Sequence, residues 1–119
     1  MRATKLQDFS EGSEVAGLTY EPNSLRVSLG VGGSVVFDNV LGFRVLDEAD
    51  LLEFWPHCSA QNGGLFQIDD GGWLSQESAR DGFLSRRAAH AVFEFFITGP
   101  NSCVNVITDA KAAFKLNAL

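Results

Sequence analysis

The sequence is poor in cysteine and has no long apolar run. Its two cysteines, Cys58 and Cys103, are too few for a disulfide scaffold and fit a reducing compartment, where such residues are usually buried as small hydrophobic side chains. The most hydrophobic stretch, 91–97, is interrupted by Glu94 and is far shorter than the roughly 20 residues that cross a bilayer. The N-terminal residues lack the apolar core of a signal peptide. We therefore expect a cytoplasmic protein with no membrane partner.

Positive charge is also scarce. Nine Lys and Arg residues stand against 15 Asp and Glu residues, which gives a formal net charge of −6. Nucleic acids and anionic membranes draw proteins through clustered Lys and Arg, so this balance argues against both. A basic protein is the kind of partner that such a charge attracts.

What is present indicates one globular domain over residues 1–119. The chain is long enough for a single core, and its residues are 45% apolar and 20% charged. The apolar residues recur mostly at period two and are interrupted by Gly, Asn and Asp, the pattern of antiparallel strands joined by hairpins. The predicted fold class is α+β, a mainly antiparallel curved β-sheet built of hairpins with one or two short helices.

Strands are expected at eight places along the chain. They are 14–20, 25–29, 34–38, 40–46, 64–69, 72–77, 88–98 and 102–108. The dipeptide Asp70-Gly71 favours a two-residue hairpin turn, which would pair Ile68 with Trp73. Segment 78–87 is predicted as a loop or short helical turn. The tail, 109–119, fits either a helical turn or a last edge strand.

At Asp47 the period changes, and a helix of about two turns is expected. Asp47 can cap its first N–H groups, Glu48 and Asp50 suit its positive end, and Pro56 disfavours its continuation. So short a helix is marginal alone and needs packing on the sheet. The side chains expected to supply that packing are Leu51, Leu52 and Trp55.

Motifs for phosphate binding, metal binding and thiol chemistry are incomplete. The glycine-rich segment 30–34 leads into a strand-like sequence and is better explained as a hairpin turn than as a phosphate loop. His57, Cys58 and Cys103 lack the paired spacing of a zinc site. Nothing in the sequence places His57 or His90 against a sulfur as a base. We predict no catalytic, cofactor or metal site.

Most of the remaining candidates for a functional site are Asp and Glu residues. Acid–base catalysis needs a carboxyl group in an apolar pocket, and these residues lie in turn or helix-end contexts. They can form a solvated, capping face, or a recognition surface in which aromatic anchors are ringed by charge. The sequence leaves open whether Trp55 and Trp73 are core or surface. The candidate partner-binding residues are Glu48, Asp50, Glu53, Asp47, Asp69, Asp70 and Trp73.

Three segments carry a family resemblance. They are GFRVLDEADLLEFW (42–55), GGWLSQE (71–77) and GPNSCVNV (99–106). In this order they resemble small proteobacterial immunity-type proteins of contact-dependent and polymorphic toxin systems, over about the C-terminal two thirds of the chain. The resemblance implies a cytoplasmic protein that binds and occludes a basic toxin domain without chemistry of its own. It identifies no contact residue.

Two other functions stay open. The chain can be a small-ligand-binding domain or small enzyme with a sheet pocket lined by Phe93, Phe95 and Trp73. It can also be an assembly module that pairs sheet edges into a homodimer.

Overall fold

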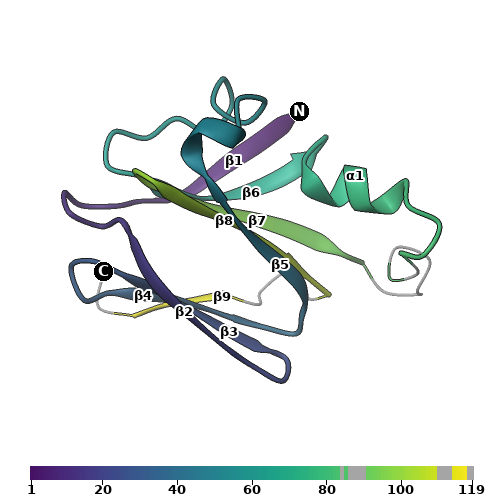
Figure 1. Cartoon of the computed structure of the whole chain (residues 1–119), viewed down its shortest axis with the longest axis horizontal. Coiled ribbons are helices and arrows are strands. Elements are labelled where there is room, and N and C mark those ends of the chain that lie inside the picture. Colours follow the sequence, from purple (N-terminus) through teal and green to yellow (C-terminus); the bar gives the residue numbers. More distant parts are fainter. Residues whose placement is uncertain (84, 86–90, 110–113, 118–119) are drawn as a thin grey trace.

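The computed structural model describes residues 1–83, 85, 91–109 and 114–117. Within them the chain forms nine strands, one 3-10 turn and one short α-helix (Figure 1). The strands are β1 (Arg2–Asp8), β2 (Val15–Glu21), β3 (Ser24–Leu29), β4 (Ser34–Asp38), β5 (Val40–Asp47), β6 (Gly64–Asp70), β7 (Phe93–Thr98), β8 (Ser102–Thr108) and β9 (Phe114–Asn117). The 3-10 turn is η1 (Glu48–Asp50) and the helix is α1 (Trp73–Ser78).

The strands form two antiparallel sheets that face each other as two layers (Figure 1). One sheet has five strands in the order β1-β6-β7-β8-β5, and the other has four in the order β2-β3-β4-β9. Asn39 joins β4 of the second sheet to β5 of the first, with φ of 54°, a left-handed conformation that Asn tolerates better than most residues. The expected antiparallel hairpin architecture is confirmed, but the class is largely β and the helical content is small.

The main core lies between the two layers. Leu25 and Val27 of β3 point into it while Arg26 is exposed, so the predicted alternation of this strand is confirmed. Phe37 and Phe95 meet across the layers with ring centroids 5.6 Å apart. Apolar burial of this kind is the dominant favourable contribution to folding.

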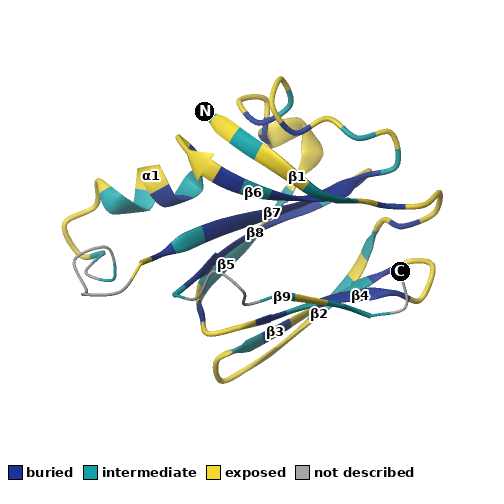
Figure 2. Cartoon of the chain, turned by 180° about the vertical axis from the view of Figure 1, so that it is seen from behind, coloured by how far each residue is buried: buried dark blue, intermediate teal, exposed yellow. Residues whose placement is uncertain are grey.

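The outer face of the five-stranded sheet is covered as well. The segment between β5 and β6 packs Leu51 and Phe54 on Phe96 of β7, and α1 packs Leu74 nearby on Ile107 of β8. Figure 1 shows both coverings on the side away from the four-stranded sheet. Because β7 and β8 are covered on both faces, every residue of each strand after the first is buried, including the polar Glu94 and Asn105 (Figure 2).

The prediction of a two-turn helix starting at Asp47 is wrong. Asp47 does cap, accepting a hydrogen bond from Ala49 N at 2.9 Å, but the element is the three-residue η1, and irregular turns follow it. Leu52 is 74% exposed, and Phe54 is buried instead. Phe54 stacks on Phe96 with centroids 4.5 Å apart, so this loop is placed by tertiary packing and not by helical periodicity.

The strand expected at 72–77 is also wrong, because these residues start α1. β6 is already paired on both sides, by β1 and β7, so no edge is free for a second hairpin arm. Ile68 therefore lies opposite Glu94 and Ala3, and not opposite Trp73.

At the ends of the chain, one strand was not predicted and one ambiguity is resolved. β1 was not among the expected strands, and the tail forms β9, which pairs with β4. The expected strand at 88–98 starts at Phe93 as β7. Residues 84, 86–90, 110–113 and 118–119, on which parts of the predictions for 78–87, 88–98 and 109–119 fall, lie outside the described residues.

Candidate functional site

Three loops meet at one end of the two layers and enclose a cavity of about 560 Å³. They are the β1–β2 connection, the β5–β6 connection and the β7–β8 turn. They meet because Asp8, Gly64 and Thr98 are neighbours across β1, β6 and β7, so these strand ends coincide. The side chains that matter for its chemistry are Glu11, Glu14, Glu48 and Trp55.

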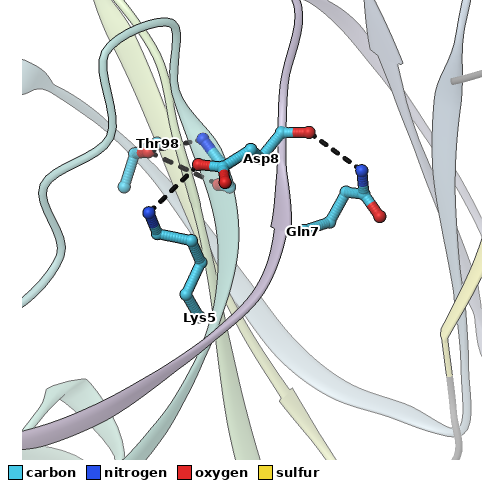
Figure 3. A network of polar contacts seen from close by, with 5 residues as sticks. Lys5, Gln7, Asp8 and Thr98 are labelled. Carbon is cyan, nitrogen blue, oxygen red and sulfur yellow. Dashed lines mark hydrogen bonds and ion pairs between the residues drawn. The ribbon is translucent and has the colours of Figure 1, made fainter.

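The frame of this cavity is held by short polar contacts. Thr98 Oγ1 accepts a hydrogen bond from Gly64 N at 2.9 Å, and Phe9 N donates to Gly63 O at 3.0 Å. Gly63 has φ of +87°, and a Cβ there would lie 2.3 Å from Thr98 O, so a glycine is required. Figure 3 shows Thr98, and shows the Lys5 ammonium directed at the Asp8 carboxylate, a 3.1 Å ion pair.

Negative charge in the cavity is not neutralised by the described residues. The ion pairs among the described residues join Lys5 to Asp8 and Arg80 to Glu77. Neither pair involves a carboxylate of the cavity. Among the described lining residues there is no Lys or Arg. The walls therefore present three carboxylates that pair with no cation of the part of the chain that the structure describes.

Trp55 adds an aromatic wall whose orientation is fixed. Its indole Nε1 donates to Glu48 O at 2.9 Å, and its ring lies 5.9 Å from that of Phe96. The side chain is half-buried. Carboxylates and an aromatic ring are the groups that hold ammonium and guanidinium ions in proteins.

The predicted acidic residues fall into separate places. Asp47 ends β5, and Glu48, which lines the cavity, and Asp50 are the ends of η1. Glu53 is exposed on the loop that follows. All four belong to one connected segment of the surface. These four acidic residues are therefore neighbours in the structure, as they are in the sequence.

Asp69 and Asp70 lie elsewhere. They are at the opposite end of the five-stranded sheet, where Asp70 faces Arg2 on β1 and Asp69 accepts from Thr4 Oγ1 at 2.7 Å. Trp73 is half-buried at the start of α1, against the outer face of the sheet. Sequence reasoning did not single out Glu11 and Glu14, although both belong to one short polar stretch between strands.

A second polar cluster is buried under α1. Glu94 is 1% exposed and accepts hydrogen bonds from Trp73 N at 3.2 Å, Leu74 N at 2.8 Å and Asn105 Nδ2 at 3.0 Å. Asn105 Oδ1 in turn accepts from Arg44 Nε at 3.0 Å, and the Arg44 guanidinium lies 5.2 Å from the Trp73 ring. The helix has no side-chain cap of its own, so Glu94 caps it from a distant strand.

Burial controls the ionisation of this cluster. It raises the pKa of Glu94, and the hydrogen bonds from Leu74, Asn105 and Trp73 and the charge of Arg44 only partly oppose it. Burial also lowers the pKa of Arg44. A carboxyl group with a raised pKa suits acid–base chemistry, but both oxygens of Glu94 are engaged, which makes it a structural group.

Glu94 also lines a smaller cavity of about 350 Å³, together with Asp69, Asp70 and Gly72. The pocket expected from Phe93, Phe95 and Trp73 does not form. Phe95 is buried between the sheets, whereas Trp73 packs on the opposite face of the five-stranded sheet.

The cysteines are free and buried in one apolar cluster. Burial raises the pKa of Cys58 to about 12 and raises that of Cys103 as well, which disfavours the thiolate needed for nucleophilic attack. His57 is exposed, and His90 lies outside the described residues. The glycine-rich segment 30–34 is a turn between β3 and β4, closed by Leu29 N to Gly33 O at 2.8 Å.

Comparisons with known proteins give no relative. No family model matches the chain, and neither a curated protein nor a solved structure matches it significantly. Within the described residues no helix is long and apolar enough to span a membrane, and no group of three or more potential metal ligands occurs.

Proposed function

We propose that the chain is a non-catalytic, cytoplasmic binding protein for a basic protein partner, of the immunity type that binds and occludes a toxin domain. The observation that carries the proposal is the acidic cavity at the loop end, where Glu11, Glu14 and Glu48 have no cationic partner among the described residues. Such a surface is complementary to a partner rich in Lys and Arg.

The overall charge supports the same conclusion. A net charge of −6 steers a basic protein toward the chain and raises the association rate, an effect that falls with ionic strength. Asp47, Asp50 and Glu53 extend the acidic region from Glu48 along the chain, and all three are exposed, so a basic surface can contact them.

The groups best suited to catalysis are poorly placed for it. Glu94 is committed to capping α1, and the two thiols are buried with raised pKa values. A ligand-binding or enzymatic role is the second candidate, favoured by the position of Glu94 in the smaller cavity. Replacement Glu94→Gln separates the two, because a catalytic role for Glu94 predicts lost turnover, whereas a binding role predicts an unchanged partner complex.

The test is co-purification with the product of the neighbouring gene. Charge reversal by Glu48→Lys with Asp50→Lys should weaken the complex at least about tenfold, since it places like charge against the partner. The matched control is Asp69→Lys with Asp70→Lys, which changes the net charge equally at the far end of the sheet. Equal loss in both pairs, or no co-purifying protein, would contradict the proposal.

A further inference from the structure

The cavity at the loop end is half open to solvent and has the size of a ligand site. Its volume of about 560 Å³ falls within the roughly 300–1,000 Å³ of typical binding pockets. An extended side chain and the adjoining backbone of a partner can therefore enter it. A flat acidic face would give only the diffuse attraction described above, so the cavity adds a point of anchorage.

The acidic walls are preorganised by the backbone on both sides. On one side Gly30 N donates to Glu14 O at 2.8 Å, and the Glu14 carboxyl group packs closely on Gly30, where a Cβ would lie 3.0 Å from it. On the other side Glu48 N donates to Asn101 O at 2.7 Å, and Glu48 O accepts from the Trp55 indole. Binding at such a site costs little ordering of the backbone.

The chemistry of the walls selects a guanidinium ion. Carboxylates on two different loops accept hydrogen bonds from several directions, and a planar fork of five donors matches this better than a compact ammonium group. The fixed indole of Trp55 offers an aromatic surface on which a guanidinium stacks. The carboxylates of Glu14 and Glu48 exclude an anion by repulsion.

We infer that this cavity is a socket for one arginine side chain of the basic partner, which Glu14 and Glu48 bind by hydrogen bonds and Trp55 by stacking. The inference rests on the proposed function, since it names the partner group that enters the site. Arginine buried in a pocket at the centre of an interface is the typical form of a binding hot spot.

The socket is tested without the partner, with N-acetyl-arginine methylamide as the probe. The indole N–H signals of Trp55 and Trp73 are followed by ¹⁵N–¹H NMR and assigned from Trp55→Phe and Trp73→Phe. The Trp55 signal should move and saturate with a Kd on the order of 1 mM, which corresponds to about −4 kcal/mol. The Trp73 signal should stay in place, because that side chain belongs to α1 on the outer face of the sheet and does not line the cavity.

Two controls make the test specific. The uncharged citrulline analogue should leave the Trp55 signal unmoved, and Glu14→Gln with Glu48→Gln should weaken arginine binding at least about tenfold, since it removes two charge-assisted hydrogen bonds. Asp70→Asn, at the far end of the sheet, should have no effect. Thermal unfolding of each variant confirms that it is folded.

A Trp55 signal that does not respond, or that responds equally to citrulline, overturns the socket. This failure is distinguishable from failure of the proposed function. If the co-purified partner is weakened by Glu48→Lys with Asp50→Lys but its affinity is unchanged by Glu14→Gln with Glu48→Gln, the function stands and the socket falls. If the arginine probe binds as described but no basic protein does, the socket stands as a site and the proposed function falls.

Discussion

Replacement Glu94→Ala should be among the most damaging single changes in this chain. It removes the carboxylate that accepts from Trp73 N, Leu74 N and Asn105 Nδ2, and it leaves those three donors without their partner in a buried place. Each unsatisfied buried donor costs about 1–3 kcal/mol. Release of the carboxylate from its own desolvation offsets part of the sum, so we expect a net loss of about 3–5 kcal/mol, as for other broken buried polar pairs.

The assay is urea unfolding at neutral pH followed by tryptophan fluorescence, which reports on Trp73 at the start of α1. With a slope on the order of 2 kcal/mol per molar urea, the midpoint should fall by about 2 M. Glu94→Gln keeps the shape and one acceptor oxygen, and its loss should be smaller, about 1–2 kcal/mol. A loss below about 1 kcal/mol for Glu94→Ala would refute the capping role.

Comparison of the native protein with Glu94→Gln also tests the ionisation of Glu94. Its pKa in the folded protein is raised above the ordinary value of 4.5, so the folded state binds the proton more tightly than the unfolded state does. The stability that comes from this tighter proton binding is therefore complete below pH 4.5, and it is lost as the pH rises through the pKa of Glu94 in the folded protein. The stability of Glu94→Gln relative to the native chain should increase across that window, and a constant difference would contradict the raised pKa.

Three further experiments test the packing described above. Gly72→Ala should lower the free energy of unfolding in urea by about 1–3 kcal/mol, because a Cβ there would lie 2.6 Å from a methyl carbon of Ile68. Gly17→Ala is the control: a Cβ there would have no atom within 4 Å, so the loss should be no more than about 1 kcal/mol. Leu51→Ala should cost about 2–5 kcal/mol and Leu52→Ala less than about 0.5 kcal/mol, since the first side chain is fully buried and the second is 74% exposed; equal losses would contradict the assigned loop packing. The buried thiols, with the pKa of Cys58 near 12, should react with a disulfide reagent only after unfolding, and rapid reaction of the native protein would contradict their burial.

Period-two patterning was enough to place most of the strands. Leu25 and Val27 alternate with less buried residues because β3 is covered on one face, and the apolar residues of β7 and β8 recur on both faces because both faces are covered. β1 was not predicted because it is an edge strand interrupted by two register shifts, and its half-buried residues have irregular spacing. Its place depends on β6, a partner more than 50 residues away in the chain.

The helix α1 could not be predicted locally because its cap is not local. Asp70-Gly71 is a strong hairpin signal, but the amides that follow it are bound by Glu94, 20 residues from Leu74 in sequence. The candidate site has the same character. The sequence indicated acidic recognition near Glu48, yet the cavity requires Glu14 and Trp55 from loops that meet only when the strand ends align.

We propose that the basic partner is bound at the acidic cavity of the loop end. The most direct test of this proposal is the affinity of the co-purified partner for two double variants, Glu14→Gln with Glu48→Gln and Asp69→Asn with Asp70→Asn, measured by titration calorimetry. The two pairs remove equal charge, so general electrostatic attraction changes equally in both. We predict at least about tenfold weaker binding for the first pair and a change within about twofold for the second; equal effects, or a larger effect of the second pair, would contradict the account.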